Sequence, residues 1–230
     1  MIRYYILFFL SLCLLKAFGQ ATELKQVENI RIEIINYGLN NTPDSKKLTE
    51  KDIAGTQYLN KNFQNAYILK INGVEVKDMP LRYNIYSNNM EFMKDENIFA
   101  IAFPSEIYRI KLAGKIFIYK QYQNADKIQH SYFEVLYEGN FQLLKKYNTI
   151  LQIPDKSNTT DSVRFVARTP DYYLRRGEGK IYPIISQKHL EKILQPVHQP
   201  IIDYIKANKI NGRDEQKLIG LMEYLDDNEN

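Results

Sequence analysis

Residues 66–83 read AYILKINGVEVKDMPLRY, with Asn72-Gly73 between two runs of β-branched, aromatic and alternating charged residues. Asn-Gly between such runs is the strongest short signal for a two-residue hairpin, because both turn residues must accept a positive φ. In that register Lys70 faces Glu75 and Leu69 faces Val76. The hairpin then carries an ion pair on one face and apolar side chains on the other.

Turn signals recur along the chain at Asn88-Asn89, Ala113-Gly114, Gly139-Asn140 and Gly177-Glu178-Gly179. The registers they predict are described by three pairs: Arg82 opposite Asp95, Ile110 opposite Phe117, and Glu134 opposite Lys145. An earlier strand is predicted at Ile30–Ile35. Five hairpins predict an antiparallel β-meander over residues 20–185, which must curl into a barrel-like or sandwich-like sheet to bury its apolar face.

After Ile185 the hydrophobic period becomes helical, which predicts a fold that is mainly β with an α tail over residues 186–230. Ser186 is the expected N-cap of a short helix that reaches Leu194. A second helix is expected over Val197–Asn208, and a third after Asn211. The apolar set of the third helix is predicted to pack on the sheet or on the second helix; its members are Leu218, Leu221, Met222 and Leu225.

Residues 1–19 read as a removable signal peptide, with Arg3 in the basic region and the apolar run Ile6–Leu15. Small residues before Gly19-Gln20 predict cleavage at that bond. The alternative is a lipoprotein anchored through Cys13, but leucine precedes this cysteine where a small residue is expected. No later stretch reaches about 18 apolar residues, so we expect no transmembrane span in the mature chain and a location outside the cytoplasm.

The charge balance excludes a nucleic-acid binder. The chain has 31 basic and 27 acidic residues, and the signal removes two of the bases, Arg3 and Lys16. Phosphate neutralisation requires a concentrated basic face, which such a balance does not supply. The only cysteine, Cys13, lies in the signal, so the mature chain is predicted to have no thiol chemistry and no disulfide.

Catalytic and metal-binding patterns are absent from the sequence. The three histidines, His130, His189 and His198, have no ligand spacing, and no glycine-rich phosphate loop occurs. We therefore expect no catalytic residue, metal or cofactor. A hydrolase that uses two carboxylates stays open, because sequence spacing does not reveal their separation. Its candidate acids are Glu91, Asp95, Glu134 and Glu138.

Tyrosine is the unusual feature of the composition, with 18 Tyr and 11 Phe but no Trp. A phenol combines an apolar ring with a hydrogen-bonding tip, which suits both protein interfaces and ligand sites. Tyr83, Tyr86, Tyr172 and Tyr173 are the candidates for an exposed ligand or partner surface. The alternative is that these tyrosines reflect the preference of aromatic residues for strands.

Three segments resemble a family of uncharacterised secreted proteins of Bacteroidetes. They are the Gly55–Asn84 segment with its LRYN end, the segment FEVLYEG at 133–139, and the helical pattern Ile201–Asn208. The resemblance covers about residues 50–225. It implies a Gram-negative envelope protein and carries no catalytic residue. In such a source, Asp161-Ser162-Val163 fits an O-glycosylation site at Ser162.

Three functions follow, in order of preference. The first is a non-catalytic interaction or accessory module that binds an envelope protein, and the second is a carrier of a small apolar ligand or glycan in or on the curved sheet. The third is the two-carboxylate hydrolase. A filled core with an exposed aromatic patch favours the first, a large apolar pocket the second, and two unpaired acids in a cleft the third.

Overall fold

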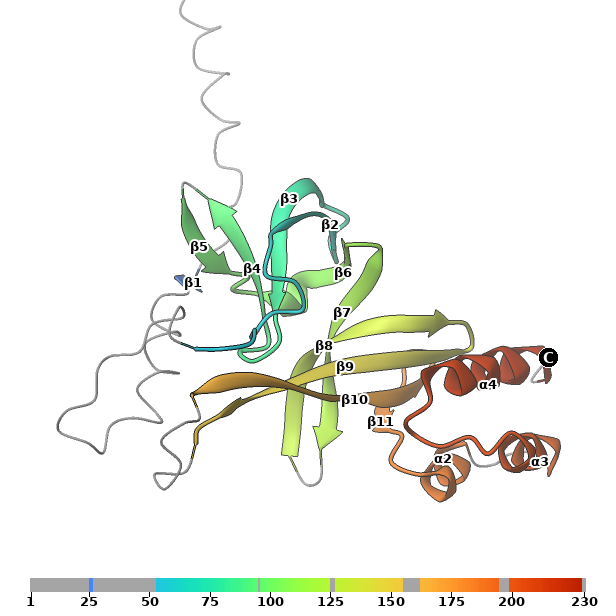
Figure 1. Cartoon of the computed structure of the whole chain (residues 1–230). Helices are drawn as coiled ribbons and strands as arrows, with labels where there is room; N and C mark the ends of the chain where they lie inside the picture. The colour runs from blue at the N-terminus through green and yellow to red at the C-terminus, as the bar shows by residue number, and fades with distance from the viewer. Residues whose placement is uncertain are drawn as a thin grey trace, which may run out of the picture.

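A computed structural model describes residues 25–26, 53–94, 96–124, 127–154, 162–194 and 199–228. Within these ranges the chain forms an 11-stranded sheet, a short 3-10 turn and three helices (Figure 1). The strands are β1 (Lys25–Gln26), β2 (Gln64–Lys70), β3 (Glu75–Asn84), β4 (Asn89–Lys94), β5 (Asn97–Ala100), β6 (Ile107–Leu112), β7 (Lys115–Asn124), β8 (Lys127–Glu138), β9 (Phe141–Gln152), β10 (Arg164–Arg176) and β11 (Ile181–Pro183). The 3-10 turn η2 spans Pro104–Glu106, and the helices are α2 (Gln187–Ile193), α3 (Gln199–Ala207) and α4 (Glu215–Asn228).

The strands lie in the order β1-β5-β4-β3-β2-β6-β7-β8-β9-β10-β11, and every neighbouring pair is antiparallel. The predicted antiparallel sheet with a helical tail is therefore confirmed. From β2 onward the meander is interrupted once, because β6 lies beside β2 and not beside β5. The chain thus returns from the edge of one group of strands to start the next, as in a Greek key.

The sheet curls and also divides. Strands β8 and β9 pair only between Glu134–Glu138 and Gln142–Lys145. Beyond that point the β7–β8 hairpin and the β9–β10 ribbon run in different directions (Figure 1). At the other end β11 contacts β7, so strands β7 to β11 curl around their own inner face.

Three buried clusters fill the two faces of the sheet. The N-terminal core comprises Ala66, Ile68, Leu81, Tyr83, Met90, Phe92, Ile107, Ile110, Leu112, Phe117 and Tyr132. The inner core, inside the curl of β7–β11, comprises Ile118, Tyr122, Phe133, Leu144, Tyr173 and Ile181. The helix core joins β9 and β10 to the helices and comprises Phe141, Leu143, Tyr172, Leu174, Ile184, Leu190, Leu194, Ile201, Ile205, Ile210, Leu218, Leu221, Met222 and Leu225.

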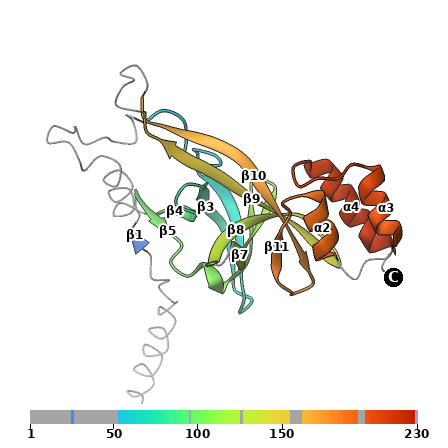
Figure 2. The ribbon, with the colours of Figure 1, turned by 90° about the horizontal axis from the view of Figure 1, so that it is seen from below.

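The helical tail covers one end of the β9–β10 ribbon (Figure 2). Helix α2 begins at the predicted N-cap, where the Ser186 side chain accepts a hydrogen bond from His189 N at 3.2 Å. Helix α4 begins after Asp214, whose carboxylate accepts from Lys217 N at 3.2 Å. The four predicted apolar residues of α4 all lie in the helix core, so the predicted packing of this helix is confirmed.

Three hairpins have the predicted turn or pairing. Ala113 and Gly114 both have positive φ, 52° and 76°, as a type I′ turn requires, and Ile110 pairs with Phe117. Glu134 lies opposite Lys145, although Glu138 pairs with Gln142, one residue further than a two-residue turn allows. The turn at Gly177–Gly179 joins β10 to β11.

The predicted pairing of Lys70 with Glu75 is wrong. Leu69 lies opposite Glu75, and the Lys70 amide donates to Val74 O at 2.9 Å across a three-residue loop. Gly73 alone in this loop has a positive φ, of 80°, which is the geometry of a type I turn followed by a bulge. One additional loop residue reverses the side of the sheet that each side chain faces relative to the predicted register. Lys70 therefore does not meet Glu75, and its Nζ lies 3.8 Å from the Glu106 carboxylate.

The predicted pairing of Arg82 with Asp95 is also wrong, because Arg82 lies opposite Glu91. The turn takes four residues, 85–88, and starts three residues earlier than predicted. Asn84 Oδ1 accepts from Ser87 N at 3.1 Å, which closes the turn locally. Asp95, the signal with Gly19-Gln20, and the strand predicted at Ile30–Ile35 lie outside the described residues.

Candidate functional site

A buried ion pair links β3 to β4. The Arg82 guanidinium lies 2.7 Å from Glu91 Oε2, and the Glu91 side chain has no solvent exposure. Asn84 Nδ2 donates to the other carboxylate oxygen at 2.8 Å. The guanidinium also lies over the Tyr58 and Phe63 rings, 3.8 and 4.5 Å from their centroids. These contacts attach the segment before β2 to the sheet, which is a structural role.

A second polar group separates the N-terminal core from the helix core on one face of the sheet. We call it the polar belt; it comprises Lys115, Glu134, Lys145, Tyr147, Tyr172 and Glu215. Lys115 Nζ and Tyr147 OH donate to the two oxygens of Glu134, at 2.6 and 2.5 Å. Lys145 Nζ and Tyr172 OH donate to Glu215 Oε2, at 2.6 and 3.0 Å. The belt therefore ties α4 to β9 and β10.

Burial and the hydrogen bonds of the belt shift the pKa values of three of its members, Tyr172, Tyr147 and Glu215. Burial and then the hydrogen bond to Glu215 raise the pKa of Tyr172 to about 12. Burial and the bond to Glu134 likewise raise the pKa of Tyr147. Burial alone would raise the pKa of Glu215, but the bonds from Lys145 and Tyr172 outweigh it and leave this pKa below its usual value.

The acids predicted for a hydrolase are bonded to cations where the structure describes them. Glu91 pairs with Arg82, Glu134 with Lys115, and Glu138 with Arg109 at 2.6 Å. Glu134 and Lys145 are opposite in register, but their side chains bond to other partners. Acids held in this way fix structure, so the described part of the chain gives the two-carboxylate hydrolase no support.

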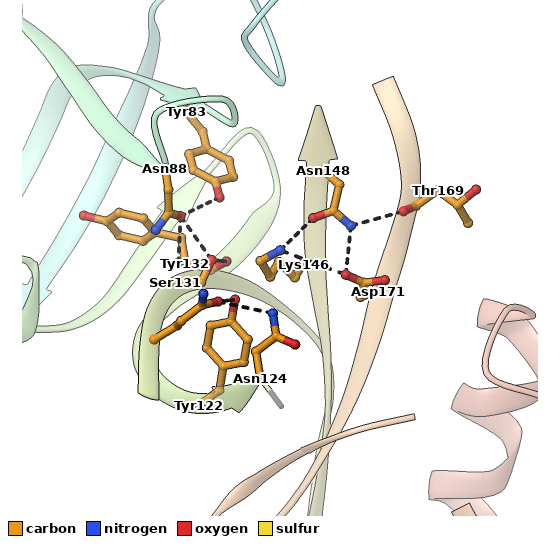
Figure 3. Close-up of polar contacts among 11 residues, drawn as sticks. Tyr83, Asn88, Tyr122, Asn124, Ser131, Tyr132, Lys146, Asn148, Thr169 and Asp171 are labelled. Atoms are coloured by element: carbon orange, nitrogen blue, oxygen red, sulfur yellow. Dashed lines mark hydrogen bonds and ion pairs between the residues drawn. The ribbon is translucent and has the colours of Figure 1, made fainter. Parts of the chain in front are cut away.

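Asn88 bonds to the edge of β8 where this strand has left β9. Its Nδ2 donates to His130 O at 3.1 Å, and its Oδ1 accepts from Tyr132 N at 3.2 Å. Tyr83 OH and Ser131 Oγ lie 3.0 and 3.1 Å from the same oxygen (Figure 3). The carboxamide thus takes the place of a peptide group of a neighbouring strand and satisfies the open edge.

A third polar group lies at one end of the inner core and is here called the ammonium cluster: Lys146, Asn148 and Asp171 (Figure 3). Lys146 Nζ donates to Asn148 Oδ1 at 2.6 Å and lies 4.0 Å from Asp171 Oδ2. Asn148 Nδ2 donates to Asp171 Oδ2 at 2.9 Å and to Thr169 O at 3.2 Å. By strand alternation, Lys146 and Asn148 follow the inner-core residue Leu144 on the same face of β9.

The environment of the ammonium cluster changes its basicity. Burial lowers the pKa of Lys146, and Asp171 opposes that shift. Burial raises the pKa of Tyr122 and Tyr173, and the Asp171 carboxylate adds to both shifts. Asp171 thus acts electrostatically on an ammonium group and on two phenols of the inner core.

Exposed apolar side chains lie in the β2–β3 turn and in the segment 103–108, which leads through η2 into β6. We call this the apolar tip: Ile71, Val74, Phe103 and Tyr108, with exposed fractions of 68%, 47%, 42% and 49%. The two segments are joined by a hydrogen bond from Ile71 N to Glu106 O at 2.9 Å. Arg109 lies over the Tyr108 ring, 5.5 Å from its centroid.

The predicted tyrosine surface is wrong for three of its four members. Tyr83, Tyr172 and Tyr173 are buried, one in each of the three cores. Tyr86 is half-buried and packs edge-on against Phe165, with ring centroids 5.2 Å apart. Strand propensity therefore explains Tyr83, Tyr172 and Tyr173 better than a binding surface does.

The described histidines do not form a metal site. His130 stacks on Tyr119, and His189 lies in α2; His198 is outside the described residues. No group of three metal-ligating side chains occurs in the part of the chain that the structure describes. Ser162, the predicted O-glycosylation site, is exposed just before β10, and its modification stays a prediction.

Sequence reasoning missed both the apolar tip and the ammonium cluster. Lys145 and Lys146 are adjacent in the sequence, but strand alternation sends them to opposite faces of β9, toward Glu215 and Asp171 respectively. That alternation was the available signal for Lys146. The sequence carried no signal for the apolar tip, because Tyr108 and Ile71 come together only through the pairing of β2 with β6.

Comparison with known proteins adds no relative: no family model, curated protein or solved structure matches this chain. Among the helices that the structure describes, none is long and apolar enough to span a bilayer.

Proposed function

We propose that this protein is a non-catalytic interaction module that acts outside the cytoplasm and binds a protein partner through the apolar tip. The observation that carries the proposal is the presence of four exposed apolar side chains on two segments that are joined by a backbone hydrogen bond. Exposed apolar residues scattered singly are ordinary, whereas a cluster marks an interaction site. Aromatic residues and arginine are enriched in protein interfaces; the tip exposes Phe103 and Tyr108, and Arg109 lies over the Tyr108 ring.

The charges around the tip favour a protein over an anionic membrane surface. Lys70 meets Glu106 at 3.8 Å, and Lys77 meets Glu75 at 3.1 Å, so the rim carries both signs in pairs. A segment that binds anionic lipid needs an excess of basic residues. The location outside the cytoplasm rests on the signal-like residues 1–19.

The test replaces Ile71 and Tyr108 together by serine in the full chain. Both side chains are exposed, so we expect an unchanged melting temperature and at least a tenfold loss of partner binding. A photo-crosslinker at position 103, in cells that produce the protein naturally, identifies the partner, and the purified pair gives the affinity. A crosslinker at Met93, an exposed apolar position on β4, is the matched control.

Two results contradict this proposal. One is that positions 103 and 93 capture the same proteins in the same amounts. The other is that the double serine variant binds the captured partner as tightly as the parent does. N-terminal sequencing of the mature protein tests the location separately, because a chain that still begins at Met1 has not been exported through signal cleavage.

A second candidate function is a carrier of a small ligand on the curved sheet, and the ammonium cluster is the observation that favours it. The inner core is filled by its own side chains, so the ligand would bind at its polar end and not inside the curl.

A further inference from the structure

We propose that the ammonium cluster is a saccharide-binding site, in which Lys146 and Asp171 hold adjacent hydroxyl groups of a sugar. The site uses β9 and β10, whereas the apolar tip uses the β2–β3 turn, η2 and β6. The inference therefore stands independently of the proposed protein partner.

The spacing of the charged groups suits a hydroxyl group. Lys146 Nζ and Asp171 Oδ2 are 4.0 Å apart, which is longer than a hydrogen bond. A hydroxyl both accepts and donates, so a single one can accept from the ammonium and donate to the carboxylate. A second, adjacent hydroxyl can bond to the remaining ammonium donors or to the other carboxylate oxygen.

The charge of the site argues against an ionic ligand. A carboxylate or phosphate that approached Lys146 would also meet Asp171, and a cation that approached Asp171 would meet Lys146. Each ion would gain one attraction and one repulsion at almost the same distance. A neutral polyhydroxyl compound uses both groups favourably, and this is the chemistry of a sugar.

The site is accessible and held in place. The Asp171 side chain is 56% exposed and that of Lys146 is 22% exposed, so a ligand reaches the carboxylate first. Asn148 holds both charged groups through its amide, and its own Nδ2 is fixed to the backbone at Thr169. A site whose polar groups are already ordered loses less entropy when the ligand binds.

An irregularity in β10 produces this arrangement. The register between β9 and β10 shifts between Arg168 and Asp171, and Pro170 lies in the shifted segment. Bulges of this kind redirect side chains and are frequent beside functional sites. Here the shift sets Asp171 opposite Lys146, on the strand that also carries Tyr173 to the inner core.

The burial of Lys146 also supports a saccharide site. It lowers the pKa of Lys146, which shows that the ammonium is partly removed from water and has more to gain from a ligand hydroxyl. The Tyr173 hydroxyl, which has no hydrogen bond to another described residue, lies within the electrostatic reach of Asp171.

The experiment is an NMR titration of the isotope-labelled full chain without its signal, with glucose, N-acetylglucosamine and maltose as separate probes. We expect amide shifts confined to Lys146, Asn148, Asp171 and their neighbours, including Tyr173. Asp171→Asn and Lys146→Met should each weaken binding at least tenfold. Lys94→Met, which alters an exposed lysine on β4, should bind as the parent does.

Several outcomes would overturn the saccharide assignment. No shift with any of the three sugars would do so, as would shifts that persist unchanged in both site variants. Sodium acetate and inorganic phosphate are the anion probes, and shifts at Lys146 with these but not with sugars would mark an anion site instead. Dispersed amide spectra of each variant verify folding, so a loss of binding is not mistaken for unfolding.

Discussion

At the scale of single residues, the buried charges of this protein are structural. Glu91 has no exposure, and each of its oxygens accepts from a named donor, Arg82 or Asn84. A buried ion pair contributes little net stability relative to apolar residues, but the loss of one partner leaves the other charge without compensation. Removal of Arg82 therefore destabilises the protein mainly because it leaves the Glu91 carboxylate buried without a cation, and less because the attraction between the two charges is lost.

This asymmetry gives a prediction. Arg82→Met should lower the free energy of unfolding by about 3–5 kcal/mol, because Glu91 is then buried without a cation. Urea denaturation of the purified chain measures the change. The double variant Arg82→Met, Glu91→Leu should recover part of the loss, although Asn84 Nδ2 then lacks an acceptor. If the single variant costs less than about 1 kcal/mol, water reaches Glu91 in solution.

At the scale of elements, the helix α4 is docked by its apolar face and by one carboxylate. Glu215 accepts from Lys145 and Tyr172 and so fastens the first turn of α4 to β9 and β10. The bonds that hold this carboxylate are strongest in its ionised state, because the charge pair with Lys145 is lost when Glu215 is protonated. Acid should therefore weaken the attachment of the helix at its N-terminal end.

The sign of the pH dependence follows from the lowered pKa of Glu215 in the folded protein. A lowered pKa gives stability that is present above the unfolded value of about 4.3 and is lost as the pH falls through the folded value. We expect the melting temperature to fall below about pH 4, and Glu215→Gln to remove that part of the dependence. Thermal melts of both proteins between pH 3 and 7 check this; parallel curves would refute it.

The elements also show how much of the fold can be predicted from the sequence. The hairpin at Ala113-Gly114 is predicted with its register. Asn72-Gly73 is the stronger signal for a two-residue turn, yet it lies in a three-residue loop in which only Gly73 takes a positive φ. The helix signals, a cap at Ser186 and a periodic apolar set in α4, depend on local spacing alone and were sufficient.

The parts that the sequence did not reveal depend on distant pairing. The placement of β6 beside β2 brings Tyr108 near Ile71 and so creates the apolar tip. The shift between Arg168 and Asp171 creates the ammonium cluster. Neither feature leaves a pattern within a short window, because each requires knowledge of which strands are neighbours.

At the scale of the whole molecule, the polar belt divides one face of the sheet into two cores. On β8, Tyr132 joins the N-terminal core, Glu134 lies in the belt, and Leu136 packs against the helix core. Apolar contact between the two cores is thus interrupted by charged side chains. Such a division lets the two halves open with different free energies.

Leu221→Ala tests that division. The side chain is fully buried in the helix core, so its truncation should cost about 2–5 kcal/mol in that half. Hydrogen exchange should then accelerate in α3, α4 and the helix end of β9, while β2, β3 and β6 keep most of their protection. Equal acceleration in both halves would mean that the sheet unfolds as one cooperative unit in spite of the belt.

The position of the helix core also bears on how the chain folds as it is made. On β9, Phe141 and Leu143 belong to the helix core, which is completed by α2 to α4 and whose last buried residue is Leu225. At a synthesis rate of about 5–20 residues per second, the ribosome needs several seconds to produce the covering segment. During that interval the nascent strands expose apolar surface to which a chaperone can bind. Nascent chains stalled just before α4 should therefore recruit chaperones more strongly than those stalled past the C-terminus.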